Sequence, residues 1–181
     1  MAEAVRWQSW DGMGVEHMVL AERAGCLVAE GALLSGGDAH FAASYEVSCH
    51  PDGTVARAHV SVTGGPKLTL QSDGDGKWRN TDGKKLTELA GALEVDFSAS
   101  PFTNTLPIRR LGLGAGESAE ITALYVRFPD LDLSLDRQRY TCIEPGRRYR
   151  YQSVDGDFEA MIDIDQQGLV TLYEGLFRRI L

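Results

Sequence analysis

Phe41-Ala-Ala-Ser-Tyr-Glu-Val-Ser-Cys49 decides the fold class, because apolar and polar side chains alternate along it. In a β-strand, successive side chains point to opposite faces of the sheet. Residues 54–62 and 157–164 show the same period of two. The pattern predicts half-buried strands with one apolar face, which in the first stretch consists of Phe41, Ala43, Tyr45, Val47 and Cys49.

Glycine marks the turns between these runs. The chain has 20 glycines, many of them in pairs typical of turns, such as Gly36-Gly37, Asp52-Gly53 and Pro145-Gly146. Turn signals about 8–12 residues apart are typical of all-β folds. With no linker or repeat in view, we expect a single β domain over residues 1–181, mainly antiparallel.

Some segments depart from simple alternation. Residues 121–128 are apolar at odd and even positions alike, so we expect a central strand that is covered on both faces. Residues 15–21 and 27–34 are expected to form strands joined at Ala24-Gly25. Short helices are expected at three places: residues 86–89, residues 105–111 and the C-terminal region around Phe177.

The overall composition is that of a globular protein, with 43% hydrophobic and 24% charged residues. A net charge of −8 argues against nucleic acid as a partner, because phosphate contacts need clustered cations. We find neither a signal peptide nor a run of apolar residues long enough to span a membrane, so stable membrane insertion is not expected. Three widely spaced cysteines suit reduced thiols, and we expect a cytoplasmic protein, with an oligomer left open.

One acidic run nearly matches a calcium-binding loop. Asp163, Asp165 and Glu174 stand at loop positions one, three and twelve, with Gly168 at position six. However, the flanking residues alternate like strands, whereas the calcium motif needs helices. A tight hairpin with Gly168 at positive φ is therefore the favoured interpretation.

Two other groups could suggest a metal site. Asp73, Asp75 and Asp82 are spaced for a cation, but they also fit hairpin turns built from Asp-Gly pairs. Cys49 and His50 are adjacent, and neighbouring residues on a strand point to opposite faces. We therefore predict a buried thiol beside a turn histidine, and no metal site.

Arginine and tyrosine alternate on both sides of the turn Glu144-Pro145-Gly146. If residues 137–140 and 147–151 pair as a hairpin, the arginines of each strand share one face and the tyrosines lie on the other. The arginines could form a solvated face neutralised by surplus acids. Alternatively, they could form a rim that binds an anion beside a surface lined by tyrosines.

The least regular stretch is residues 96–111. Its two prolines exclude continuous strand pairing, and the polar side chains that follow Phe102 can satisfy a turn or cap a short helix. It could be a crossover held by local hydrogen bonds, or it could place Asn104 and an arginine at the mouth of a pocket. Near the N-terminus, Trp7 and Trp10 are expected to pack on the core, although exposed aromatic residues also bind carbohydrate or lipid.

This irregular stretch carries a family resemblance. Pro101-Phe-Thr-Asn-Thr-Leu-Pro-Ile-Arg-Arg-Leu111, preceded by Glu94-Val-Asp96-Phe97, resembles the signature of a bacterial family of glycolipid-binding proteins. Other segments agree with the family in order along the chain: Trp10, Gly14-Val-Glu16, Tyr45-Glu-Val-Ser-Cys49, Gly76-Lys-Trp78, Tyr125-Val-Arg-Phe-Pro129, Arg139-Tyr140, Tyr149-Arg-Tyr151, Gly168-Leu-Val170 and Tyr173-Glu-Gly175-Leu-Phe177-Arg178.

The resemblance implies a large curved sheet, a half-open β-barrel, similar to the bacterial lipoprotein carriers that shelter acyl chains. It implies no catalytic residue and no cofactor. We therefore expect a protein that binds an amphipathic molecule, a lipid or glycolipid, on the concave face of the sheet. The residues expected to contact this ligand are Trp10, Asn104, Arg109, Arg110, Tyr125, Tyr140, Tyr149 and Tyr151.

Two other functions stay open. One is a small hydrolase-type enzyme that uses carboxylates or one of His17, His50 and His59. The other is a structural or partner-binding protein whose interior is filled by its own side chains.

Overall fold

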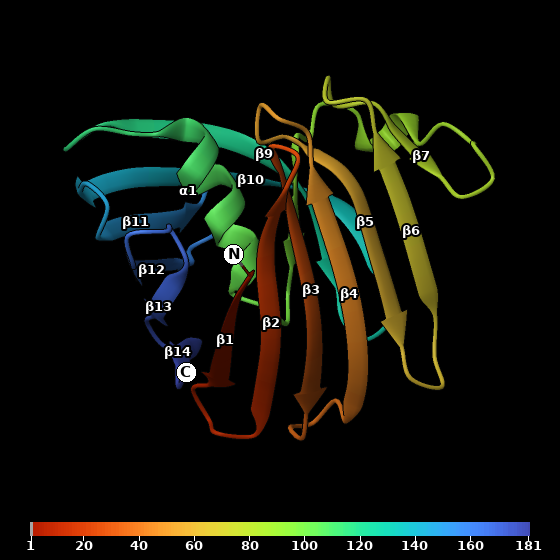
Figure 1. Cartoon of the computed structure of the whole chain (residues 1–181), viewed down its shortest axis with the longest axis horizontal. Coiled ribbons are helices and arrows are strands. Elements are labelled where there is room, and N and C mark those ends of the chain that lie inside the picture. The colour runs from red at the N-terminus through yellow and green to blue at the C-terminus, as the bar shows by residue number, and fades with distance from the viewer. Residues whose placement is uncertain (1) are drawn as a thin grey trace.

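Fourteen strands form one large curved sheet that does not close, confirming the predicted fold class (Figure 1). The computed structural model describes residues 2–181. The first seven strands are β1 (Ala2–Ser9), β2 (Gly14–Arg23), β3 (Cys26–Ser35), β4 (Phe41–Cys49), β5 (Val55–Val62), β6 (Lys67–Ser72) and β7 (Trp78–Asn80). The other seven are β8 (Glu94–Phe97), β9 (Ser118–Arg127), β10 (Asp132–Glu144), β11 (Arg148–Ser153), β12 (Glu159–Ile164), β13 (Val170–Tyr173) and β14 (Phe177–Arg179).

The chain builds the sheet in two halves that meet at β1. Hairpins carry it outward from β1 to β7, which is one edge of the sheet, and β8 forms the other edge. Strands β9 to β14 then return in order, and β14 pairs with β1. In Figure 1, β1 to β6 run side by side on one flank, and the strands of the second half cross behind and beside them.

One detail of the sheet differs from the expectation. The region around Phe177 is strand β14 rather than a helix, because its backbone pairs with β1 on one side and with β13 on the other. The sheet is mainly antiparallel, as predicted, and β8 pairs with β9 in parallel. A parallel pair needs a long connection, and the residues between β8 and β9, which include a short helix, supply it.

The expected strand at residues 121–128 is β9, but it lies next to the edge strand β8 rather than in the centre of the sheet. Both of its faces are nevertheless covered. Its neighbouring residues Ala123 and Leu124 point to opposite faces, and both are buried in different parts of the core. The prediction that this strand is covered on both faces is therefore confirmed, and the prediction that it lies in the centre of the sheet is wrong.

A short helical segment lies between the two halves of the sheet (Figure 1). It consists of the 3₁₀ helix η2 (Phe102–Asn104) and the helix α1 (Thr105–Leu111), and a further 3₁₀ turn, η1 (Thr87–Leu89), precedes β8. Pro107 is tolerated because it stands in the first turn of α1, where its missing N–H has no helical partner to lose. Gly112 ends α1 in the left-handed conformation. The helices expected at residues 86–89 and 105–111 are thus confirmed.

The hairpin interpretations of the acidic runs are confirmed. Gly168 has a φ of +79°, and Asp165 Oδ1 accepts hydrogen bonds from the backbone of Gln167 and Leu169. Asp73 Oδ1 likewise caps the turn before β7 by accepting from the backbone of Asp75. Among residues 2–181, no group of three or more His, Cys, Asp or Glu side chains is placed to hold a metal ion.

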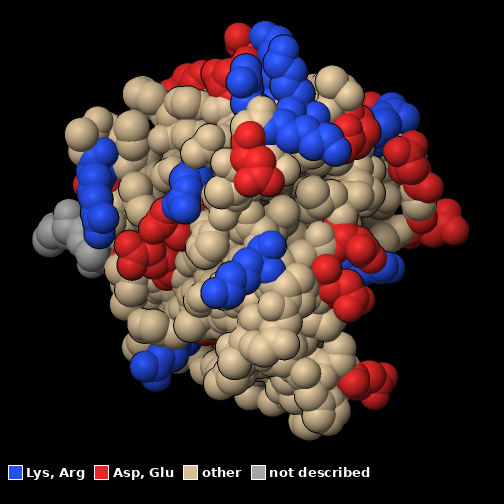
Figure 2. Space-filling view, turned by 90° about the vertical axis from the view of Figure 1, so that its right-hand side faces the viewer, with Lys and Arg blue, Asp and Glu red and all other residues tan. Residues whose placement is uncertain are grey.

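Charged side chains are dispersed over the surface. On the face shown in Figure 2, acidic and basic side chains are interspersed and separated by large uncharged areas. In the described part of the chain, no helix has the length and apolar character needed to cross a bilayer.

Candidate binding site

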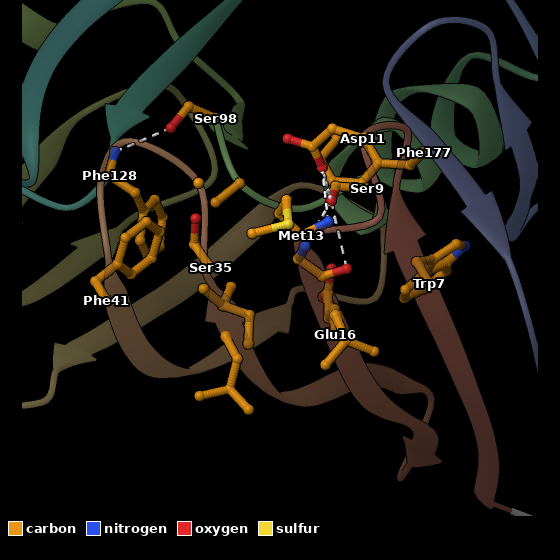
Figure 3. A pocket seen from close by; sticks show the side chains of 16 residues that line it. Trp7, Ser9, Asp11, Met13, Glu16, Ser35, Phe41, Ser98, Phe128 and Phe177 are labelled. Atoms are coloured by element: carbon orange, nitrogen blue, oxygen red, sulfur yellow. Dashed lines mark hydrogen bonds between the residues drawn. The ribbon is translucent and has the colours of Figure 1, made fainter.

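Two cavities adjoin on the inner face of the curved sheet. The first, here called the apolar cavity, has a volume of about 230 Å³ and lies at the end of β1 to β4 (Figure 3). The second, here called the tyrosine cavity, has a volume of about 270 Å³ and lies against β8, β9 and β11. Ser98 and Phe177 line both cavities, so the two form neighbouring parts of one site.

The apolar cavity takes its character from strand alternation. Trp7, Leu33 and Phe41 stand at inward positions of β1, β3 and β4, and Phe128 closes the cavity from the second half of the sheet. Phe41 and Phe128 stack with ring centroids 5.8 Å apart. Met13 is 56% exposed and stands at the mouth. Such a lining suits an apolar ligand group.

Glu16 is the unusual member of this lining, because it is an acid at an inward position of β2 and is only 2% exposed. The hydroxyl of Tyr45 donates a hydrogen bond to Glu16 Oε1, and Ser100 Oγ donates to the same oxygen at 2.7 Å. Tyr45 reaches Glu16 by lying across Gly31, where an added Cβ would stand 2.2 Å from its ring. Strand β3 therefore requires glycine at this position.

Burial raises the pKa of Glu16 from 4.5 to about 7, although the bonds from Tyr45 and Ser100 oppose this rise. Because the folded state holds the proton more tightly than the unfolded state, the contribution of Glu16 to stability is present below pH 4.5 and is lost as the pH rises through about 7. Near neutral pH, the carboxyl group is therefore divided between its neutral and charged forms.

We expect Glu16→Gln to remove this pH dependence. At about 1.4 kcal/mol per pKa unit, the wild-type protein should lose about 3 kcal/mol of unfolding free energy from Glu16 between pH 4 and pH 8. Glutamine carries no proton to lose, so the variant should lack that slope and be more stable than wild type at pH 8. Urea unfolding at both pH values measures the difference. Equal slopes for the two proteins would contradict the expectation.

The tyrosine cavity is lined by Tyr125, Tyr151 and Tyr173 together with Asp96 and Asn104. This combination presents aromatic faces beside hydrogen-bonding groups.

Asp96 is held in place by its neighbours. Its Oδ1 accepts from Thr103 Oγ1 at 2.9 Å and its Oδ2 from Gln138 Nε2 at 2.7 Å. The same nitrogen of Gln138 donates to Asp136 Oδ2 at 2.8 Å, so one amide bridges two carboxylates. Burial raises the pKa of Asp96. The polar wall of this cavity is therefore rigid and acidic.

Asn104 is held in place by two hydrogen bonds. The hydroxyl of the buried Tyr140 donates to Asn104 Oδ1 at 2.9 Å, and Asn104 Nδ2 donates to the carbonyl oxygen of Pro101 at 3.3 Å. Tyr140 thus positions a lining residue without lining the cavity itself.

The structure brings together only some of the residues expected to bind a ligand. Asn104, Tyr125 and Tyr151 line the tyrosine cavity, and Tyr140 is hydrogen-bonded to Asn104. The remaining four lie elsewhere and line neither cavity: Trp10, Arg109, Arg110 and Tyr149.

The two helix arginines lie at a different pocket. Arg109 and Arg110 line a recess beside Cys49 and His50. Arg110 Nε donates to Glu94 in an ion pair, and Arg109 also reaches the hairpin between β12 and β13. Helix α1 begins at the cavities and runs away from them, so its last turn cannot reach them.

Tyr149 and Trp10 stand apart from both cavities. Tyr149 lines a shallow pocket near Arg109. Trp10 is 53% exposed in the turn after β1, so it does not pack on the core as expected, whereas Trp7 is fully buried.

The arginines of the β10–β11 hairpin follow the solvated interpretation. Tyr140 pairs with Tyr151 across the hairpin and faces inward, which leaves the arginines on the other face, where Arg150 is half-buried. Arg137 bonds Glu120 and Asp155, each at 3.2 Å, and Arg148 bonds Asp163 at 2.6 Å. These exposed pairs do not border the tyrosine cavity.

No arginine, lysine or histidine is among the residues that line the two cavities. The charged members are all acids: Asp11, Glu16 and Asp96. The histidines considered for catalysis, His17, His50 and His59, are absent from both linings.

Sequence reasoning missed Glu16, Asp96 and Phe177 as lining residues. A signal existed for Glu16, because it is in phase with Met18 and interrupts an otherwise apolar face. No sequence pattern marked Phe177 as a lining residue, because its place at the cavities depends on the pairing of β14 with β1.

Comparisons with known proteins agree with the architecture. A crystal structure of a DUF1089 family protein from Pseudomonas aeruginosa superposes with a TM-score of 0.80 at 35% sequence identity, covering 96% of this chain and 92% of that chain. No protein of curated function matches the sequence. The family described as "Putative glycolipid-binding" matches residues 4–179, nearly the whole chain. The chain therefore belongs to this family.

Proposed function

We propose that this protein binds an amphipathic molecule, with its apolar chain in the apolar cavity and an uncharged polyhydroxyl head in the tyrosine cavity. The observation that carries the proposal is the junction of two chemically different cavities at Ser98 and Phe177. A ligand that spans this junction would satisfy both linings at once. The family description points to the same class of ligand, a glycolipid.

Asp96, Asn104 and the tyrosines of the second cavity suit a polyhydroxyl head group. Carboxylate and amide oxygens accept hydrogen bonds from sugar hydroxyls, and tyrosine rings offer faces for the apolar side of a sugar ring. Asp96 and Asn104 are held rigidly by Thr103 and Tyr140, so little ordering is needed on binding.

The charge of the site disfavours an anionic head. With acids and no cations in the linings, a phosphate or carboxylate head would lose its hydration without gaining a partner. Arg109 and Arg110, expected to address a polar head, line neither cavity, so the proposal puts the head at the tyrosine cavity instead.

The proposal predicts measurable binding of n-octyl β-D-glucoside below its micelle concentration. n-Octyl phosphate, which has the same chain and an anionic head, should bind at least about tenfold more weakly because it faces only acids. Isothermal titration calorimetry measures both affinities. Absence of binding by the glucoside, or equal affinity for the two probes, would sink the proposal.

A matched pair of variants locates the chain-binding part. Met13→Asp places a carboxylate at the mouth of the apolar cavity and should weaken glucoside binding about tenfold or more. Ile143→Asp makes the same change at a residue that is 47% exposed on β10 and lines neither cavity, so binding should persist. An equal effect of both variants would place the chain elsewhere.

A further inference from the structure

The carboxyl group of Glu16 has one oxygen without a partner. Oε1 accepts from both Tyr45 and Ser100, whereas Oε2 is buried and has no hydrogen bond with any described residue. Buried polar atoms without a partner are rare and costly in folded proteins. Because Glu16 lines the apolar cavity, a ligand in that cavity is the natural source of the missing partner.

The hydrogen bonds decide where the proton of the neutral acid sits. Ser100 Oγ accepts from the backbone N–H of Phe102 at 3.2 Å, which leaves its own hydrogen for Glu16. Tyr45 directs its hydroxyl hydrogen to the same oxygen. Since Oε1 already accepts two bonds, the carboxyl proton belongs on Oε2, where it forms a donor.

The hydrogen bonds from Tyr45 and Ser100 favour the charged form of Glu16, but no cation among the described residues lies beside it, and burial outweighs them. Burial raises the pKa of Tyr45 well above its usual value, so Tyr45 stays neutral. Asp11, at the same cavity, has its pKa lowered by the Ser9 hydroxyl and stays ionised. The Trp7 indole on β1 donates to Val170 instead, and Leu33 on β3 is apolar. With burial holding the pKa near 7, the neutral acid is substantially populated under mild conditions.

The position of Glu16 is also informative, because it stands at the boundary of the two cavities. It lines the apolar cavity, and its partner Ser100 lines the tyrosine cavity. In a ligand that spans both, the atoms nearest this boundary are those that join the chain to the head.

We propose that Glu16 donates the proton on Oε2 as a hydrogen bond to a carbonyl oxygen of the ligand, the ester or amide that joins its apolar chain to its head. The inference rests on the proposed function and narrows it to acyl-linked amphiphiles. A carbonyl oxygen is an uncharged acceptor that enters an apolar cavity at low cost, and it provides the bond that Oε2 lacks.

Two probes with chains of eight carbons test the inference. Octanoyl-N-methylglucamide carries an amide carbonyl between chain and polyol, and n-octyl β-D-glucoside has only a glycosidic oxygen there. For the wild-type protein, the Kd of the glucamide should rise about tenfold between pH 5.5 and pH 8.5 as the Oε2 proton is lost. The Kd of the glucoside should change less. Calorimetry at both pH values gives all four constants.

Glu16→Gln supplies the decisive variant, because its side-chain N–H₂ replaces the Oε2 proton permanently. The variant should keep the low-pH affinity for the glucamide at pH 8.5, to within about twofold. Glu120→Gln makes the same change at an exposed carboxyl that lines neither cavity, and this matched control should retain the wild-type pH dependence.

A measurement on the wild-type protein keeps the test independent of how the variants fold. If the glucamide binds the neutral acid, it must raise the pKa of Glu16, which NMR of the side-chain carboxyl carbon reports directly. A raised pKa supports the inference. An unchanged or lowered pKa overturns it.

Failure of the proposed role of Glu16 can be distinguished from failure of the proposed binding function. If neither probe binds at any pH, the proposed function itself fails. If both probes bind but wild-type affinity is independent of pH, or the glutamine variant binds weakly throughout, the role of Glu16 is wrong and the function stands. Affinity for the glucamide that rises with pH would also overturn the inference, since the ligand would then donate to a carboxylate.

Discussion

Replacing Trp7 with alanine is expected to lower the free energy of unfolding by about 4 kcal/mol, one of the two largest effects we predict. The side chain is fully buried, and its indole Nε1 donates to the carbonyl oxygen of Val170 at 2.7 Å. The bond joins β1 to the start of β13, across the seam where the two halves of the sheet meet. Alanine leaves a large void and an unpaired carbonyl oxygen on Val170. It therefore weakens both the packing of the core and the contact between the two halves of the sheet.

Urea unfolding followed by circular dichroism measures this loss, and Trp7→Phe divides it into parts. Phenylalanine fills most of the space but cannot donate, so it should cost only about 1–2 kcal/mol. If Trp7→Ala unfolds the protein outright, the phenylalanine variant still reports on the bond. A loss below about 1 kcal/mol for Trp7→Ala would show that the seam does not depend on this residue.

The sequence was most informative where contacts are local. The hairpins from β2 to β5 could be predicted because alternation and glycine turns act within a few residues, as in Phe41–Cys49. Strand β14 could not, since three residues carry no period and its partner Trp7 lies at the opposite end of the chain from Arg179. Its structure follows from a tertiary pairing that overrides local preference.

The candidate site shows the same contrast between what local sequence predicts and what depends on the tertiary structure. Asn104, Tyr125 and Tyr151 were identified, and they do meet at one cavity. Arg109 and Arg110 follow Asn104 closely in sequence, but the intervening helix carries them to another pocket. Proximity in sequence was thus a poor guide across a helix. Strand phase would have been a better guide, because it places Glu16 on the inner face.

Arg110→Met is the second large prediction, with an expected loss of about 3–5 kcal/mol at pH 8. Arg110 pairs with Glu94, whose side chain is only 1% exposed and whose Oε2 has no described partner. Burial already raises the pKa of Glu94 against the opposing effect of Arg110. Without the guanidinium, the carboxylate would be buried alone, and its pKa would rise further.

The sign of the pH dependence follows from this rise. A carboxyl whose folded-state pKa is raised loses stability as the pH increases, so the Arg110→Met penalty should be large at pH 8 and much smaller at pH 4, where Glu94 is protonated. The double variant Glu94→Gln/Arg110→Met buries no charge and should recover at least half of the loss at pH 8.

Urea unfolding of the three proteins at both pH values measures these differences. If the single variant loses little at pH 8, or the double variant is no more stable than the single, Arg110 does not act by neutralising Glu94. A ligand-binding role for Arg110 at its own pocket would then be the better explanation of its position.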